Sequence, residues 1–304
     1  MRVSSIDIGT NTVLLLVADV RGKTLRPIEH GHSIARLGQK VDKRRTITPE
    51  AMDRVGKVLE EYVAISKAHS AEQIVVCGTS ALRDADNRDD FLRFVRTRFG
   101  INVKILTGRE EAELTYSGAL SEFPDDQVGE YAVLDIGGGS TEIITGTRSV
   151  VSAAVSLNIG CVRLTERFLK AAPPDPKSLQ QCLARIRELI GSLPGIKPST
   201  KLIGVAGTVT TLAAMDLRLP HYDPLRVSGH VLSLAVIQRF FDQLSIKSLD
   251  ELKAVPQIHG GRADIILAGI IILLELMKEM GRDEVTVSDR GLRYGFALRE
   301  AKQH

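Results

Sequence analysis

Two elements of this 304-residue sequence occur twice at almost the same spacing. Asp7, within residues 5–12 (SIDIGTNT), returns 128 positions later as Asp135, within residues 134–141 (LDIGGGST). The glycine of residues 75–80 (VVCGTS) returns 129 positions later within residues 203–208 (IGVAGT). Matched elements at one offset indicate an internal repeat, so the sequence predicts two copies of one α/β unit of about 120–130 residues.

Each copy begins with an apolar strand that turns sharply at glycine and returns as a second apolar strand. This pattern predicts a β-hairpin whose tip carries backbone N–H groups and hydroxyls. We expect a first domain over residues 1–122 and a second over 123–291, separated within the acidic segment 121–126. Residues 292–304 have the pattern of an amphipathic helix, which we expect to pack back on the first domain.

The composition excludes several classes of protein. Hydrophobic residues make up 43% and charged residues 25%, which is typical of globular proteins and not of disordered ones. A net charge of +3 and 4% aromatic residues argue against nucleic-acid binding. Three cysteines without a CxxC pair indicate reduced thiols. The most apolar stretch, residues 265–274, is shorter than the ~20 residues that cross a bilayer. We therefore expect a cytoplasmic protein without membrane or nucleic-acid partners.

The tip of the first hairpin has the residue types of a phosphate and metal site. Gly9 allows close approach of the backbone to a phosphate, and Thr10 and Asn11 supply donors. Asp7, at the end of the strand, can hold a divalent cation directly or through water, and Asp135 repeats it. The alternative is a hairpin whose polar side chains only satisfy the turn. Because the tip occurs twice, we favour phosphate binding in a cleft between the two domains.

The second tip is richer in glycine than a hairpin requires. Each glycine costs roughly 0.5–1 kcal/mol relative to alanine, so a run of three suggests a loop that lies against a ligand. The residues of this tip that we assign to phosphate binding are Gly137, Gly138, Gly139, Ser140 and Thr141. Glu142 follows them, where it could receive a water molecule or a metal-bound water.

Two further turns, at residues 78–83 and 207–208, lead from strands into helices. Gly207 and Thr208 place amide donors at a helix N-terminus, which favours anions. Arg83 can bind a phosphate with its guanidinium, or it can form a surface salt bridge with Asp84 or Asp86. Arg36 is a weaker candidate of the same kind. The basic cluster 43–45 is either a solvated loop or a means of steering a polyanion.

The segment 107–113 (TGREEAE) contains three carboxylates with different explanations. Thr107 and Glu110 have the spacing of a capping box, so Glu110 is explained by helix structure. Glu113 is expected on an exposed face. Glu111 is either a carboxylate that favours the first turn of a helix or, if this helix lines the cleft, the general base for a water nucleophile. The sequence shows no HExxH zinc motif and no GxSxG nucleophile elbow.

Six motifs in this order resemble the exopolyphosphatase/guanosine pentaphosphate phosphatase family: SIDIGTNT, GTSALR, GREEA, DIGGGSTE, GCVRLTE and GVAGT. The resemblance extends over residues 3–298. It implies a duplicated actin-like, ribonuclease H-like α/β fold with an active site between two domains, and the short form of the family, without a C-terminal HD-type domain. The sequence departs from the family pattern near its end, where Tyr294 stands in place of an expected glutamate.

The resemblance also implies an activity and residue roles. It implies Mg²⁺-dependent release of terminal phosphate from inorganic polyphosphate, with Mn²⁺ as an alternative metal and the 5′ γ-phosphate of pppGpp as an alternative substrate. Glu111 would be the catalytic glutamate, Glu142 would help hold the attacking water, and Asp7 and Asp135 would serve the metal. An actin-like ATPase or kinase, and a silent polyphosphate or nucleotide sensor, stay open as rivals. Family analogy favours a homodimer.

Overall fold

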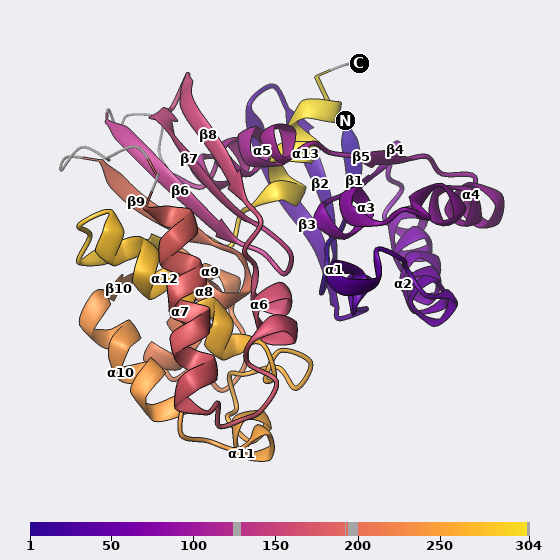
Figure 1. Ribbon diagram of the computed structural model, residues 1–304. Helices are drawn as coiled ribbons and strands as arrows, with labels where there is room; N and C mark the ends of the chain where they lie inside the picture. Colours follow the sequence, from indigo (N-terminus) through magenta and orange to yellow (C-terminus); the bar gives the residue numbers. More distant parts are fainter. Residues whose placement is uncertain (124–128, 192, 194–199, 303–304) are drawn as a thin grey trace. The chain divides into compact units, whose positions relative to one another are not determined.

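The computed structural model describes residues 1–123, 129–191, 193 and 200–302, and it divides into two compact units (Figure 1). Unit 1 comprises Met1–Pro124 and Arg290–His304, and unit 2 comprises Asp125–Asp289. Positions 124–126 of the segment expected to separate the domains, and positions 303–304 of the expected last helix, lie outside the described residues. Among the described residues, no helix is both long and apolar enough to span a bilayer.

The sheet of unit 1 has five strands in the order β3-β2-β1-β4-β5. Strands β1, β2 and β3 form an antiparallel meander, and β4 and β5 continue the sheet parallel to β1. The hairpin between β1 and β2 has the tip that was predicted from its glycine. The strands are β1 (Arg2–Ile8), β2 (Val13–Arg21), β3 (Thr24–Ser33), β4 (Gln73–Gly78) and β5 (Val103–Ile105).

Helices cover both faces of this sheet (Figure 1). Because side chains alternate along a strand, Ile6 and Ile8 contact the core beneath α2 and α4, and Asp7 points to the opposite face. That opposite face, with Cys77, is covered by α5 and α13. The helices of the unit are α1 (Val41–Arg44), α2 (Pro49–Ala68), α3 (Ser80–Asp84), α4 (Arg88–Phe99), α5 (Gly108–Leu120) and α13 (Leu292–Glu300). Asp7 therefore lies on the same side of the sheet as α5.

Helix α13 packs directly against α5, and glycines permit the close approach. A Cβ atom on Gly118 would lie 2.9 Å from the backbone nitrogen of Gly295. The buried ring of Tyr294 lies beside two guanidinium groups, with Arg290 at 5.2 Å and Arg293 at 5.3 Å from the ring centroid. Tyr294 thus offers an aromatic face to cations where the family pattern has a carboxylate.

The sheet of unit 2 has six strands in the order β10-β11-β9-β6-β7-β8. Strands β6, β7 and β8 again form an antiparallel meander, and β9 and β11 continue it in parallel. The short strand β10 pairs antiparallel with β11. The strands are β6 (Glu130–Ile136), β7 (Thr141–Thr147), β8 (Val151–Leu157), β9 (Lys201–Val205), β10 (Val231–Ser233) and β11 (Glu284–Val287).

The core of unit 2 is built around α12, whose residues 266–277 are all buried. This helix contains most of the apolar stretch noted in the sequence, and α6, α7, α8 and α10 pack against it. The helices are α6 (Cys161–Arg167), α7 (Pro176–Ile190), α8 (Ala206–Asp216), α9 (Pro224–Val227), α10 (Leu234–Leu244), α11 (Leu249–Lys253) and α12 (Ile266–Glu279).

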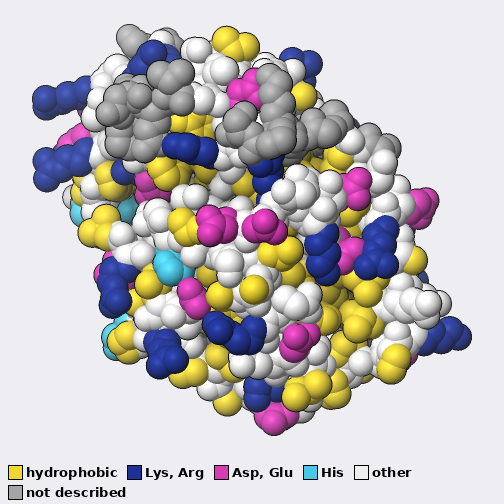
Figure 2. Space-filling model, turned by 90° about the vertical axis from the view of Figure 1, so that its left-hand side faces the viewer, with side chains coloured by type: hydrophobic (Ala, Val, Ile, Leu, Met, Phe, Trp, Pro, Cys, Tyr) yellow, Lys and Arg dark blue, Asp and Glu magenta, His cyan; other side chains and the backbone are white. Residues whose placement is uncertain are grey.

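The two sheets share one strand order. Counted from the meander, β3-β2-β1-β4-β5 of unit 1 corresponds to β8-β7-β6-β9-β11 of unit 2. The predicted duplicated α/β fold of the actin-like, ribonuclease H-like kind is confirmed. On the face shown in Figure 2, Lys and Arg side chains are interspersed with Asp and Glu, in keeping with the small net charge.

Candidate active site

The tip of the β1–β2 hairpin is held by a loop that follows β3. The Gly9 amide donates to the carbonyl of Thr12 at 2.9 Å, which closes the turn. The carbonyl of Thr10 accepts from the Gly38 amide at 2.8 Å, and that of Asn11 accepts from the Arg36 amide at 2.9 Å. Arg36, the weaker phosphate candidate, thus contributes a backbone donor that fixes the tip.

The tip of the β6–β7 hairpin repeats this arrangement with a helix in place of the loop. The Gly137 amide donates to the Ser140 carbonyl at 3.0 Å. The carbonyl of Gly137 accepts from the Cys161 amide, and that of Gly138 accepts from the amides of Val162 and Arg163. The first turn of α6 therefore fixes the second tip as the loop fixes the first.

Fixing the carbonyls also orients the neighbouring amides. In a trans peptide the C=O of one residue and the N–H of the next point in opposite directions. The amides of Gly138 and Gly139 must therefore point away from α6, and the amide of Asn11 points away from the loop. Within the part of the chain that the structure describes, none of these three amides donates to a backbone carbonyl. Successive amides on one side of a turn form an anion-binding nest.

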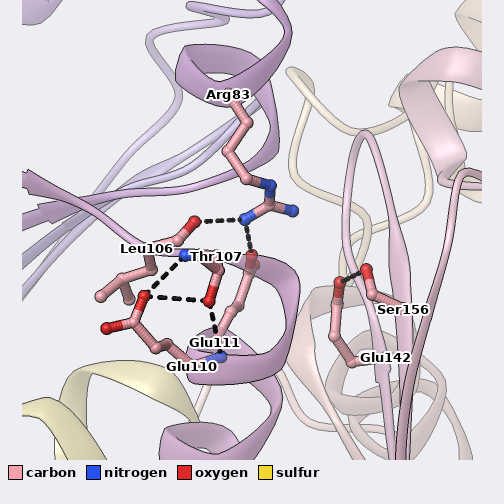
Figure 3. Close-up of polar contacts among 7 residues, drawn as sticks. All are labelled: Arg83, Leu106, Thr107, Glu110, Glu111, Glu142 and Ser156. Carbon is pink, nitrogen blue, oxygen red and sulfur yellow. Dashed lines mark hydrogen bonds and ion pairs between the residues drawn. The ribbon is translucent and has the colours of Figure 1, made fainter.

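Glu111 lies in the first turn of α5, where Thr107 and Glu110 form the predicted capping box. The residue is 7% exposed, and its side chain forms a short ion pair with Arg83 of α3 (Figure 3). The same Arg83 nitrogen donates to the Leu106 carbonyl at 3.0 Å. Asp84 and Asp86, the local partners considered for Arg83, both lie beside Arg45 of the basic cluster.

Asp7 and Glu111 act on the same buried thiol. Asp7 pairs in register with Cys77 on the neighbouring strand β4. Burial raises the pKa of Cys77 well above its ordinary value, and the negative charges of Asp7 and Glu111 raise it further. Asp7 and the helix that carries Glu111 therefore lie on the same side of the sheet of unit 1.

Unit 2 has a carboxylate pair on its own hairpin. Asp135 of β6 is directly opposite Glu142 of β7. Residues directly opposite in an antiparallel pair share a face of the sheet. Glu142 is 1% exposed and accepts a hydrogen bond from the Ser156 hydroxyl of β8 at 2.7 Å (Figure 3). Two facing carboxylates repel each other unless a cation or a shared proton lies between them.

The other predicted phosphate residues of unit 2 lie in packed surroundings. The Thr141 hydroxyl donates to the Ile159 carbonyl at 2.7 Å, so its side chain fastens the tip to the segment before α6. Ser140 is buried at the tip. Thr208 packs against α12, where a Cβ on Gly269 would lie 2.8 Å from its methyl group.

Sequence reasoning missed Arg262. A Cβ on Gly207 would overlap its guanidinium, so Arg262 lies directly over the N-terminus of α8. Burial raises the pKa of Cys161 to about 11, and Arg262 partly opposes this shift, which places its charge near α6 as well. A cation at the N-terminus of α8 is suited to phosphate. The only indication in the sequence was the glycine at position 207, which is consistent with close approach of another group.

The donor set is compatible with Mg²⁺ only if the substrate contributes ligands. Among the described residues there is no group of three or more His, Cys, Asp or Glu side chains arranged around one metal position. Asp135 with Glu142, and Asp7 near Glu111, each supply two carboxylates. Mg²⁺ is commonly held by one or two carboxylates together with substrate phosphates, so the residues fit this ion.

These features define a class of protein: one of the duplicated actin-like α/β fold, with a glycine hairpin tip in each unit whose carbonyls are held by neighbouring backbone amides. A sequence model of the Ppx/GppA phosphatase family matches residues 16–304. The chain belongs to this phosphatase family, so the resemblance stated from the motifs is confirmed.

Individual relatives agree with the family over the full length. The chain is 37% identical to exopolyphosphatase 2 of Mycobacterium tuberculosis, with 98% of each chain covered. The crystal structure of the Aquifex aeolicus Ppx/GppA family member superposes with a TM-score of 0.84 at 33% identity, covering 100% of this chain and 98% of that one. An exopolyphosphatase structure from Cytophaga hutchinsonii gives a TM-score of 0.89 at 26% identity, with coverage of 100% and 98%.

Proposed function

We propose that the protein hydrolyses inorganic polyphosphate and releases its terminal orthophosphate. The observation that carries this proposal is the fixed orientation of the tip amides, because Asn11 in unit 1 and Gly138 and Gly139 in unit 2 present donors to anions. Two such tips suit a substrate with several phosphate groups. The name of the Mycobacterium tuberculosis relative supports polyphosphate as that substrate.

The proposed phosphate contacts are distributed over both units. In unit 1 the tip residues Gly9, Thr10 and Asn11 bind phosphate oxygens, assisted by the guanidinium of Arg83. In unit 2 the binding groups are Gly137, Gly138, Gly139, Ser140, Thr141, Gly207 and Thr208, together with Arg262. Backbone amides and fixed guanidinium groups stabilise charge on phosphoryl oxygens without reorganising during the reaction.

Asp7 in unit 1 and Asp135 in unit 2 are each proposed as a ligand for Mg²⁺, with Mn²⁺ as the alternative. The ion would neutralise charge on the phosphate oxygens. Glu142 holds the attacking water through its carboxylate, and Ser156 keeps that carboxylate in one orientation with its hydrogen bond of 2.7 Å.

Glu111 is the proposed general base. Its ion pair with Arg83 fixes the carboxylate at the start of α5. As the water oxygen bonds to the terminal phosphorus, one proton passes to Glu111 and the bridging P–O bond breaks. The shortened polyphosphate leaves with the bridging oxygen, and orthophosphate is released.

Glu111→Gln tests this role, because glutamine keeps the size of the side chain and removes the base. We expect kcat for polyphosphate to fall by ~10²–10⁴, with the Kd for polyphosphate changed by less than about threefold. Glu113→Gln is the matched control, since Glu113 lies on the same helix and pairs with Arg109. A Glu111→Gln enzyme with wild-type turnover would remove Glu111 from the mechanism.

A substrate panel tests the substrate class. Phosphate release from polyphosphate, pppGpp and ATP is measured at matched concentrations with Mg²⁺. The proposal expects the highest kcat/KM for polyphosphate. A preference for pppGpp would make the protein a 5′-phosphohydrolase of that nucleotide, and a preference for ATP would make it an actin-like ATPase. Tight polyphosphate binding without release would identify a sensor.

A further inference from the structure

Arg163 is a buried charged side chain that none of the roles above uses. It lies in the first turn of α6 and is 8% exposed. Its Nε–H donates to the carbonyl oxygen of Gly139 at 2.7 Å. This is a charge-assisted hydrogen bond from a side chain to the backbone of the glycine tip.

The bond completes a series. The carbonyls of Gly137 and Gly138 accept from backbone amides of α6, at 2.9 Å from Cys161 and 2.9 Å from Val162. The next carbonyl, that of Gly139, accepts from the Arg163 side chain. Three successive carbonyls are therefore all directed toward α6. Backbone amides of α6 donate to the first two, and the Arg163 guanidinium donates to the third.

The close fit between the tip and α6 depends on Gly160. A Cβ atom on Gly160 would lie 2.5 Å from the carbonyl carbon of Gly138 and 2.6 Å from the nitrogen of Gly139. The tip thus lies directly on the backbone before α6, which brings the Gly139 carbonyl within reach of Arg163. In the first tip, the two middle carbonyls accept from the backbone amides of Arg36 and Gly38 instead.

We propose that Arg163 is a positioning residue for the phosphate site of unit 2. Because the Gly139 carbonyl is held by the guanidinium, the Ser140 amide across the same peptide bond points to the opposite side, beside the amides of Gly138 and Gly139. The positive charge also polarises that peptide and increases the attraction of its N–H for an anion. Arg163 acts through the tip and does not touch the ligand.

Two features favour this role over simple packing. Unlike a neutral donor, the guanidinium carries a positive charge, which would stabilise an anion bound to the other side of the tip. The bond is also made to the last glycine of the run, whose backbone would otherwise have the conformational freedom of a residue without a side chain. The proposal rests on the phosphate-binding role given to this tip.

The test compares Arg163→Met, Arg163→Lys and Arg167→Gln in otherwise intact protein. Arg167 lies one turn further along α6 and is exposed, so its variant removes the same charge without touching the tip. Inorganic phosphate is the binding probe, measured by calorimetry well below each variant's Tm. We expect Arg163→Met to raise the Kd for phosphate and lower kcat/KM for polyphosphate by about ten- to hundredfold. Arg163→Lys should recover part of the loss, and Arg167→Gln should stay within twofold of wild type.

Several results would overturn the proposal. One is a wild-type Kd for phosphate in Arg163→Met, since a merely structural arginine would lower Tm and leave the affinity of the folded protein unchanged. Another is an equal loss in Arg167→Gln, which would point to general electrostatics. If wild-type protein binds phosphate but does not hydrolyse polyphosphate, the proposed function fails while the binding comparison still tests Arg163.

Discussion

The contact between α5 and α13 predicts that one methyl group far from the substrate will lower turnover. A Cβ atom on Gly295 would lie 2.6 Å from the carbonyl carbon of Leu114, closer still to its oxygen, and 2.7 Å from the Ser117 hydroxyl. Ordinary contacts are 3.4–4 Å, so in Gly295→Ala the two helices must separate by roughly 1 Å. Leu114 lies one turn after Glu111, so this separation moves the proposed base.

The expected magnitudes follow from this displacement. Overpacking of a closely packed contact costs about 1–3 kcal/mol, which corresponds to a fall in Tm of roughly 2–12 °C for a protein of this size. A shift of about 1 Å in a catalytic group can lower turnover by about 10²-fold. From this dependence of turnover on displacement, Gly295→Ala should lower kcat for polyphosphate by about ten- to a hundredfold.

The assay measures phosphate release at saturating polyphosphate. The temperature is at least about 20 °C below Tm, so that the variant stays folded. Gly129→Ala is the matched control, because a Cβ there meets no atom within 4 Å. A lower Tm with unchanged kcat would refute the link between this packing and Glu111. A variant with unchanged Tm and kcat would refute the close approach itself.

Three further predictions test other parts of the site. The cysteine thiols are buried with raised pKa values, about 11 for Cys161, about 12 for Cys182 and well above 9 for Cys77. The unfolded chain therefore loses thiol protons first, and urea titrations should show stability falling above about pH 9 by up to ~1.4 kcal/mol per pH unit for each thiol. Ser156→Ala should lower kcat about three- to tenfold by removing the hydrogen bond to Glu142, whereas Ser152→Ala on the same strand should leave kcat unchanged. Chelation by EDTA should abolish phosphate release, and Asp135→Asn should raise the Mg²⁺ concentration for half-maximal activity about tenfold or more, seen in a metal titration.

The duplicated fold could be predicted because it depends on local pattern. Apolar strands, glycine turns and the capping box of Thr107 and Glu110 are decided by neighbours a few residues apart, and the structure has them where the sequence placed them. For Arg83, this local reasoning considered only neighbouring carboxylates, Asp84 and Asp86, as salt-bridge partners. Its contact with Glu111, 28 residues away, depends on how α3 and α5 meet beside the sheet.

Other contacts between distant segments could not be predicted from the sequence either, because they too depend on how separate elements pack together. Arg262 reaches Gly207 across 55 positions, and Arg163 reaches Gly139 across 24. Both arginines contact glycines. From the sequence alone, a glycine that no turn requires indicates only that some other group comes close to it. Identifying that group required the packing of α6, α8 and the segment before α12.

The duplication repeats the backbone of the site more faithfully than its chemistry. In unit 2 the strand-end Asp135 faces Glu142 across the hairpin, whereas in unit 1 Asp7 faces Leu14 at the corresponding position. Unit 1 instead obtains its second carboxylate, Glu111, from the start of α5, and Arg83 holds it there. The two hairpin tips hold their carbonyls in the same way, which is what the proposed binding of phosphate by both tips requires. Their carboxylates could diverge because water activation and water binding need charges in different places, so the proposed base and the proposed water ligand come from different structural elements.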